Sequence, residues 1–260
     1  MRQRNAPNRL FEPVENKPVS IAVITQIENL ILSGVLQEGD MLPGERELAA
    51  QFGISRPKVR EALSQLADRD LIKVIANDGA YVAQLGGEVM SPAMVDLFNR
   101  SPSAIRGNLE YRREIEGFAT RLAAQRATDS DREELLRIAA AMEAADADTD
   151  STLASELDLA LHHTIAFAAH NHTLTHMMTA LYNLNRSSLF YNRDELLNID
   201  KVAQILLEQH TGIVEAICQS KPAAAEKAAQ KHIDYVTSLI ETAFDLRTRE
   251  DLSSKRYSRC

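Results

Sequence analysis

Apolar residues in the N-terminal third of the chain recur at helical spacing in three short stretches. The first covers residues 20–32 and is followed by Gly34, which predicts a helix that ends before this glycine. The second covers residues 45–52 and is ended by Gly53. The third covers residues 56–66, where a serine N-cap and a proline in the first turn are typical helix-start signals. Three short helices are therefore expected.

Two β-rich segments follow the third predicted helix. Residues 72–75 and 80–83 flank the sequence Asn77-Asp78-Gly79, a combination that predicts a β-hairpin. Three helices and a hairpin within one short stretch are the elements of a winged helix-turn-helix. Its third helix would enter the major groove of DNA by its N-terminus, and the second helix would brace it.

The remainder of the chain shows helical periodicity and no convincing strand. Paired glycines and a Ser-Pro step at residues 86–92 predict a linker. Alanine-rich helical patterns then cover residues 93–99, 103–126, 130–147, 152–170, 172–191, 196–219 and 222–246. The fold class expected is mainly α, with an N-terminal winged helix-turn-helix and a C-terminal all-helical bundle of six to seven helices.

These patterns predict the domain boundaries. Residues 1–17 are polar and form a flexible arm, and residues 18–85 form the winged helix-turn-helix domain. Residues 86–92 are the linker and residues 93–246 are the helical domain. Residues 247–260, beyond the last periodic segment, are expected to be a tail.

Composition narrows the class of protein. The chain has 260 residues, of which 25% are charged and 45% hydrophobic, as is typical of a globular protein. No apolar run reaches the roughly 18–20 residues that span a membrane, and the N-terminus has no apolar core of a secretory signal. Cys218 and Cys260 form no Cys-x-x-Cys pair. A cytoplasmic protein without membrane partners is expected.

The net charge of −8 is distributed unevenly. Residues 1–86 carry a net charge of −1 and residues 87–260 a net charge of −7. Any surface that attracts nucleic acid must therefore be a local basic patch in the first domain.

Such a patch is predicted on the third helix. Arg56, Lys58 and Arg60 cluster in its first turns, and Arg46 lies at the start of the bracing helix. An arginine fork can bind guanine O6 and N7 or a phosphate, and Ser55 with the neighbouring backbone amides can hold a phosphate. The alternative is that these side chains form an ordinary solvated helix face.

The same segment resembles a known family. The sequence "LPGERELAAQFGISRPKVREALSQLADRDLI", followed by "GAYV", is similar to the DNA-binding domain of the GntR family of bacterial transcription regulators. The resemblance implies that Arg46, Arg56 and Arg60 contact operator DNA and that Gly79 of the wing approaches the minor groove. This wing departs from the family in carrying Asp78, which is expected to repel phosphate.

The helical half contains a candidate metal site. Asp158 and His162 are four residues apart and share one helix face, whereas His163 is rotated by about 100°. His210 and His232 lie on two later helices, flanked by apolar residues. One carboxylate and three imidazoles could converge on a zinc, nickel, manganese or iron ion. The alternative is that each histidine is a hydrogen-bonded core residue.

The remaining histidines gather around a helix break. His170, His172 and His176 flank an Asn-His-Thr sequence. We interpret them as helix-end and surface residues rather than as a second metal site.

This half resembles the FCD ligand-binding domain of the FadR subfamily of GntR regulators. The resemblance lies in "YRREIEGFATRLAAQRAT" and in the positions of the four candidate ligands, Asp158, His162, His210 and His232. It implies a divalent metal, zinc first, whose open coordination positions take a small carboxylate effector. Arg112 then holds the other end of the effector, and Asn185 is a second candidate for the cavity. Some similar, pyruvate-responsive members lack the metal ligands.

Three functions are compatible with these residues. The helical domain could be a metal-assisted sensor of a small organic acid, a metalloenzyme, or a dimerisation domain with a structural metal. The sequence has no His-Glu-x-x-His motif and no carboxylate placed by its spacing as a general base, which argues against an enzyme. We therefore expect a transcription repressor that binds a pseudo-palindromic operator as a homodimer and responds to a small organic acid.

Overall fold

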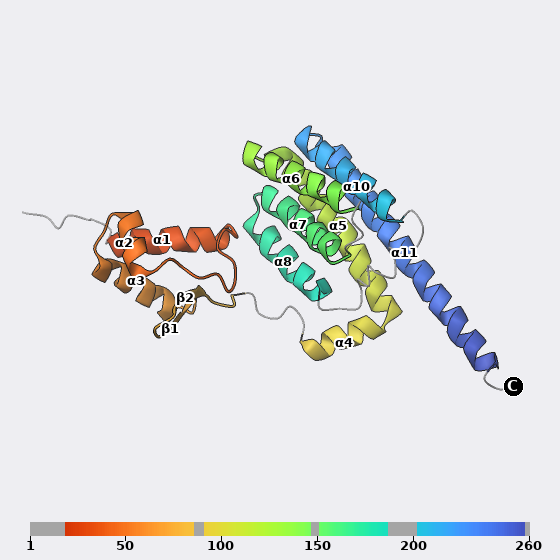
Figure 1. Ribbon diagram of the computed structural model, residues 1–260, viewed down its shortest axis with the longest axis horizontal. Coiled ribbons are helices and arrows are strands. Elements are labelled where there is room, and N and C mark those ends of the chain that lie inside the picture. The colour runs from red at the N-terminus through yellow and green to blue at the C-terminus, as the bar shows by residue number, and fades with distance from the viewer. Residues whose placement is uncertain (1–18, 86–90, 147–150, 187–201, 258–260) are drawn as a thin grey trace, which may run out of the picture. The chain divides into compact units, whose positions relative to one another are not determined.

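The computed structural model describes residues 19–85, 91–146, 151–186 and 202–257 (Figure 1). The chain divides into two compact units, with the boundary between Leu85 and Gly86. The expected arm at residues 1–17 and most of the expected linker lie outside the described residues.

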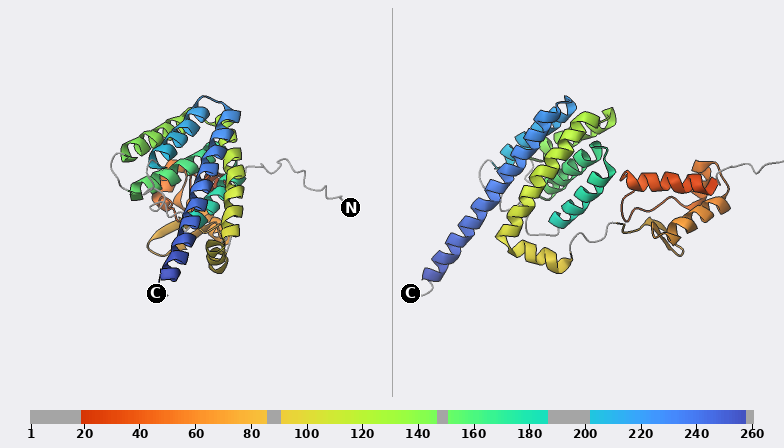
Figure 2. Two further views of the ribbon diagram at one scale, coloured as in Figure 1. Left: turned by 90° about the vertical axis from the view of Figure 1, so that its right-hand side faces the viewer. Right: turned by 180° about the vertical axis from the view of Figure 1, so that it is seen from behind.

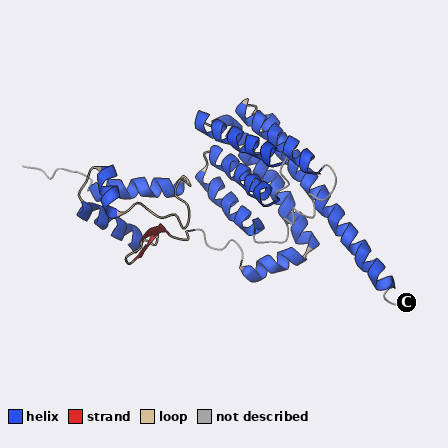
Figure 3. Cartoon of the chain, in the orientation of Figure 1, coloured by secondary structure: helices blue, strands red, loops and turns tan. Residues whose placement is uncertain are grey.

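The N-terminal unit contains three helices and a hairpin (Figure 3). Its elements are α1 (Val19–Leu32), α2 (Glu45–Phe52), α3 (Arg56–Asp68), β1 (Ile72–Ile75) and β2 (Gly79–Val82). One apolar core joins all of them and includes the fully buried residues Val59, Ala62 and Leu66 of α3. The opposite face of α3 is left exposed, so the core fixes which side chains the unit presents to a partner.

The turn between α2 and α3 depends on a glycine. Gly53 adopts a left-handed conformation with φ of 66°, and its amide caps the carbonyl ends of α2. Ser55 occupies the N-cap position of α3 with an extended backbone, but its hydroxyl makes no capping hydrogen bond. Ser55 is therefore the N-cap by position only, and its exposed side chain lies at the start of α3.

The hairpin is antiparallel and pairs Ile75 with Gly79. β2 begins at Gly79, one residue before the predicted start, because the turn needs only three residues and places Asn77 at a positive φ of 62°. If residue 79 carried a Cβ atom, that atom would lie 2.7 Å from Cε of Met41, closer than a Cβ atom normally approaches another heavy atom. The wing glycine therefore allows Met41 to pack closely against the hairpin.

The C-terminal unit is a bundle of helices, and none of its described residues forms a strand. Its described helices are α4 (Pro92–Arg100), α5 (Pro102–Arg126), α6 (Asp129–Asp146), α7 (Ser151–Ala168), α8 (His172–Arg186), α10 (Val202–Cys218) and α11 (Pro222–Tyr257). The bundle predicted from the helical periodicity is confirmed. Figure 2 shows α5 and α11 side by side, and they form the most extensive helix pair of the unit.

Two predicted boundaries need correction. Pro92 belongs to α4 rather than to the linker, because Ser91 caps that helix by accepting a hydrogen bond from the Met94 amide. The last helix does not end at residue 246 but continues to Tyr257, through most of the segment predicted to be a tail. Residues 247–257 contain no glycine or proline, so the helix can propagate after its apolar periodicity has weakened.

Apolar packing surrounds a small polar interior in the bundle. One core cluster joins α5, α6, α7, α10 and α11, and a second joins α5, α7 and α8. The few buried polar side chains of this unit lie on the same helices: Arg112, Glu116, Thr120, Asp158, His162, Thr175, His210 and His232. None of the helices that the structure describes could span a membrane.

Candidate metal centre and nucleic-acid interface

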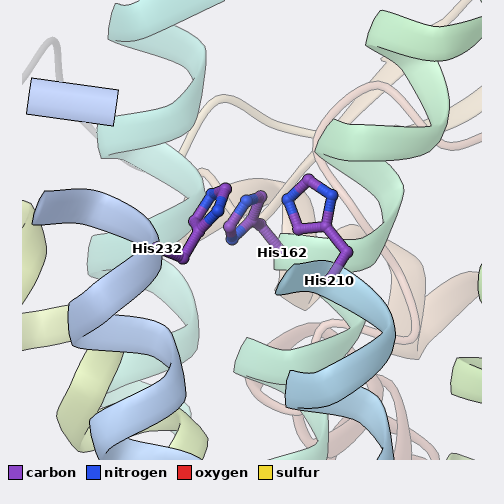
Figure 4. Close-up of side chains that lie close together, drawn as sticks. All are labelled: His162, His210 and His232. Atoms are coloured by element: carbon purple, nitrogen blue, oxygen red, sulfur yellow. The ribbon is translucent and has the colours of Figure 1, made fainter. Parts of the chain in front are cut away.

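Three buried histidines from three helices meet inside the C-terminal bundle. Figure 4 shows the rings of His162 from α7, His210 from α10 and His232 from α11 grouped together. One nitrogen of each ring lies within 4.8 Å of a nitrogen of the others, and the three side chains are at most 5% exposed. Three of the four predicted metal ligands are therefore brought together by the fold.

The fourth predicted ligand lies beside this group. Oδ1 of Asp158 is 3.3 Å from Nε2 of His210, and both side chains are buried. Asp158 and His162 occupy one face of α7 at the predicted separation of four residues, and both are less than 10% exposed. His163 on the next face packs instead against Tyr182 and Phe167, with ring centroids 5.1 and 6.2 Å away.

A carboxylate that the sequence analysis did not single out lies next to the histidines. Glu116 of α5 accepts a hydrogen bond from Nδ1 of His162 at 2.9 Å through one oxygen. Its other oxygen accepts a hydrogen bond from Nε of Arg112 at 2.8 Å. The predicted effector residue Arg112 is thus buried and is linked to a candidate metal ligand by one carboxylate.

The second residue missed by sequence reasoning is Gln209. Its Oε1 lies 3.0 Å from Nδ1 of His232. Nε2 of His162 and Nε2 of His232 are both buried and have no hydrogen-bond partner among the described residues. Buried imidazole nitrogens of this kind are normally satisfied, and a cation bound at Nε2 would satisfy them. The donor set therefore fits a metal ion that prefers nitrogen ligands.

The pKa values of the buried groups are shifted in different directions. Burial alone would raise the pKa of Glu116, but the charge of Arg112 and the contact with His162 outweigh it and lower this pKa to about 2. Burial also opposes the charged form of His162, yet the charge of Glu116 raises the pKa of His162 overall. Burial, together with the neighbouring imidazoles, holds the pKa of His232 well below its usual range. The imidazole of His232 is therefore neutral at pH 7.

The other predicted residues of this domain are placed as follows. Asn185 falls in the last turn of α8, and its side chain lies outside the described part of the structure. His170, His172 and His176 are exposed near the break between α7 and α8, as predicted for surface residues. His170 has a positive φ of 45° and pairs with Asp131 of α6 at 2.8 Å, a structural contact between α6 and the turn that follows α7.

The candidate nucleic-acid interface lies at the start of α3. Arg56, Lys58 and Arg60 are exposed, with at least half of each side chain accessible. Glu45, the first residue of α2, accepts hydrogen bonds from Nε and Nη2 of Arg60 at 2.9 and 2.7 Å. Nη2 of Arg56 lies 3.8 Å from the same carboxylate. The basic cluster is therefore organised by an acidic residue that the sequence analysis did not select.

The remaining predicted DNA-binding residues surround this cluster. Arg46 is exposed at the start of α2, and Ser55 is exposed at the start of α3. Gly79 lies in the wing, where the carboxylate of Asp78 accepts a hydrogen bond from the Tyr81 hydroxyl at 2.9 Å. The acidic group of the wing is thus directed to a partner within the hairpin.

Family comparisons agree with the division into two units. The family of bacterial regulatory proteins named gntR matches residues 20–82, and the FCD domain family matches residues 108–235. The first match covers the winged helix-turn-helix. The second contains all four candidate metal ligands together with Arg112 and Glu116.

Similar proteins are transcription regulators. The chain is 32% identical to the Glc operon transcriptional activator of Escherichia coli K12, over 84% of this chain and 87% of that protein. It is 30% identical to the putative L-lactate dehydrogenase operon regulatory protein of the same organism, over 84% of each chain. It is also 30% identical to the transcriptional repressor NanR of Citrobacter rodentium, over 87% of this chain and 86% of that one.

The fold comparison agrees with the sequence comparison. The structure of a GntR protein from Streptococcus agalactiae matches 84% of this chain and 99% of its own, with a TM-score of 0.52 and 24% identity. The matched families and relatives are regulators, in agreement with the prediction that the chain is not an enzyme. The chain belongs to the GntR family of bacterial transcription regulators, with an FCD domain as its C-terminal unit.

Proposed function

We propose that the FCD domain senses a small monocarboxylic acid at a divalent metal site and thereby controls how tightly the winged helix-turn-helix binds its operator. The observation that carries the proposal is the pair of buried Nε2 atoms of His162 and His232, next to the Asp158–His210 contact. In this proposal Asp158, His162, His210 and His232 hold the metal, with zinc as the first candidate and nickel, manganese or iron as alternatives. The metal supplies positive charge and open coordination positions.

Charge balance supports a monocarboxylate. The charged side chains of the site are Arg112, Glu116 and Asp158, with a formal sum of −1, and a divalent ion changes the sum to +1. Buried charge is costly unless it is compensated, so one carboxylate group of the effector would neutralise the site. A dicarboxylate would leave an excess negative charge. One relative is named for an L-lactate dehydrogenase operon, and lactate is a small monocarboxylate.

The guanidinium of Arg112 is suited to hold the acid. Its side chain is 5% exposed, and its Nε is fixed by Glu116, so the planar group is held in one orientation. A buried, oriented guanidinium gives charge-assisted hydrogen bonds to a carboxylate at little entropic cost. Asn185, at the end of α8, stays a second candidate for this role.

We infer that the chain acts as a homodimeric repressor of the FadR subfamily. One recognition helix reads only half of an operator, so two copies of α3 would read a pseudo-palindromic site. Arg46, Arg56, Lys58 and Arg60 would contact bases and phosphates, with Ser55 and Gly79 at the DNA backbone and in the minor groove. Acid binding would weaken operator binding through a coupling of about 1–3 kcal/mol.

The test combines metal analysis with operator binding. Native mass spectrometry of the purified chain is expected to show a dimer with one divalent ion per subunit. Titration with lactate, and with succinate as a small dicarboxylate, is expected to release operator DNA only with the former. Because coupling is reciprocal, operator DNA must weaken lactate binding by the same factor. Unchanged lactate affinity on DNA, or absence of metal, contradicts the proposal.

A further inference from the structure

Two of the three clustered imidazoles are held in the same way. His162 directs Nδ1 to Glu116 at 2.9 Å, and His232 directs Nδ1 to the oxygen of Gln209 at 3.0 Å. In both rings the opposite nitrogen, Nε2, is buried and lacks a hydrogen-bond partner within the described ranges. The supporting residues come from different helices, α5 and α10, so the pattern does not arise from a single local turn.

The hydrogen bonds at Nδ1 select one tautomer of each neutral imidazole ring. A neutral imidazole has one nitrogen that donates and one that accepts. The carboxylate of Glu116 can only accept a hydrogen bond. With the amide oxygen of Gln209 facing His232, the acceptor is again the supporting residue, so the proton lies on Nδ1 in both rings. The lone pair is then on Nε2, and a metal ion needs that lone pair to bind. The partners of Nδ1 therefore determine which ring atom is available to a ligand.

Glu116 is held in place as a hydrogen-bond acceptor by Arg112 as well as by His162. Arg112 holds the other carboxylate oxygen, and both side chains are about 5% exposed. One oxygen of Glu116 accepts a hydrogen bond from Nε of Arg112 at 2.8 Å, and the other accepts from Nδ1 of His162 at 2.9 Å. The carboxylate offers no proton, and its two oxygens are directed to two different donors. Rotation of this carboxylate would break both hydrogen bonds at once.

We propose that Glu116 is a positioning residue that fixes Nε2 of His162 as a metal-binding atom, and that Gln209 does the same for His232. The inference rests on the metal site proposed above and extends it to residues that do not touch the metal. Since Glu116 also holds Arg112, it joins the residue proposed to bind the acid to a residue proposed to bind the metal. Displacement of Arg112 would thus reach His162 through one side chain.

The first variant is Glu116→Gln, which keeps the shape of the side chain. A glutamine has one acceptor oxygen, and its NH2 group would face either Arg112 or His162, both of which donate. We expect zinc affinity, measured by competition with a chromophoric chelator, to fall about 10- to 100-fold. The matched control is Glu114→Gln, which removes the same charge from the exposed face of α5 and should bind zinc like the unmodified chain.

A second variant tests the other ring and does not remove a buried charge. Gln209→Met keeps the length of a half-buried side chain but removes the acceptor for Nδ1 of His232. Its control is Gln204→Met on the exposed side of α10. Gln209→Met is expected to weaken zinc binding to the same extent as Glu116→Gln. Gln204→Met is expected to bind zinc like the unmodified chain. Circular dichroism and thermal unfolding identify any variant that fails to fold.

Nuclear magnetic resonance distinguishes positioning from a merely structural role. Long-range proton–nitrogen spectra of the metal-free chain, at about pH 9 where imidazoles are neutral, report which ring nitrogen carries the proton. The signal of His162 is assigned by its absence in His162→Gln. We expect the Nδ1–H form in the unmodified chain and a mixture of both forms in Glu116→Gln.

Zinc affinity tests the metal site, and the protonated nitrogen of His162 tests the positioning role of Glu116. If the unmodified chain binds no zinc but His162 shows the Nδ1–H form that Glu116→Gln loses, the metal site is wrong and the positioning of the ring is correct. If the unmodified chain binds zinc and Glu116→Gln retains both full affinity and the Nδ1–H form, the positioning role is overturned. Loss of affinity in the Glu114→Gln control to the same extent also contradicts it.

Discussion

Arg60 of α3 donates two hydrogen bonds to Glu45, at 2.9 and 2.7 Å. The guanidinium edge formed by Nε and Nη2 is therefore directed to α2 in the free protein. The same carboxylate places negative charge within the surface proposed to meet DNA. Glu45 therefore orients an arginine that is proposed to bind DNA, and its negative charge would oppose the approach of phosphate.

We expect Glu45→Gln to reduce the preference for operator DNA over random duplex DNA rather than to weaken DNA binding overall. Removal of the charge should strengthen binding to random duplex DNA, whereas the loss of orientation should weaken operator binding. Exposed ion pairs contribute about 0.2–1 kcal/mol, so the ratio of operator to random affinity should fall by up to about fivefold. Fluorescence anisotropy with both duplexes measures this ratio. Glu47→Gln, on the same helix, is the control and should leave the ratio unchanged.

Arg56→Ala is expected to lose specific operator binding while the protein stays folded. The side chain is 60% exposed and lies outside the core, so its removal should not unfold the unit. A bidentate base contact contributes about 1–3 kcal/mol, which corresponds to a loss of about 5- to 150-fold for each half-site. Arg69→Ala, at the other end of α3, is the control. Normal retardation of operator by Arg56→Ala would refute the assignment of α3.

His210→Ala is expected to lose both metal and response to the acid. His210 is 1% exposed and contacts Asp158, so its removal takes away one proposed ligand and leaves a buried carboxylate beside the gap. Elemental analysis and operator release by lactate are the two measurements. His172→Ala, which changes an exposed histidine at the start of α8, should behave like the unmodified chain. A His210→Ala protein that still responds to lactate would place the metal outside the sensing path.

Metal affinity is expected to fall as the pH is lowered. The pKa of His162 is raised above its usual value of 6.5, so this ring carries a proton to a higher pH in the metal-free protein. Metal binding must displace that proton, which lowers the affinity by up to about tenfold for each pH unit below the raised pKa. Zinc titrations between about pH 6 and pH 8 measure the slope. A flat profile would show that His162 is not a ligand.

Chelation is expected to destabilise only the FCD domain. The core of the winged helix-turn-helix draws its residues from Val23 to Val82, and the cores of the bundle draw theirs from Ile105 onward. A metal at 100 times its dissociation constant adds about 2.7 kcal/mol of stability to the unit that binds it. Calorimetry with and without EDTA should therefore shift one transition and leave the other in place.

Local sequence signals predicted most of the fold. Gly53 and Pro57 mark the end of α2 and the start of α3, and the Asn77-Asp78-Gly79 turn marks the hairpin. These signals work because glycine accepts a positive φ that other residues rarely adopt, and proline fixes its own φ. The end of α11 was predicted wrongly because no such residue marks it, and the loss of apolar periodicity does not by itself stop a helix.

The four candidate ligands were predicted from the spacing of Asp158 and His162, the apolar flanks of the other two histidines, and the family resemblance, but the residues that support them were not. The spacing of Asp158 and His162 shows that they share a face of α7. Nothing in the spacing shows that Glu116 reaches His162, or that Gln209 reaches His232, since each pair joins two helices. These contacts follow from the packing of α5 against α7 and of α10 against α11. The separation of four residues between Arg112 and Glu116 was the one local signal available.

The position of the candidate ligands on α7, α10 and α11 has a consequence for how the protein matures. Asp158 and His232 are far apart along the chain, and long loops must close before they meet. The bundle has its own apolar layers around Leu161 and Ile213, so it has a reason to fold that does not depend on a cation. We therefore expect the newly made chain to fold first and acquire its metal afterwards, unlike small zinc domains that fold only around the ion.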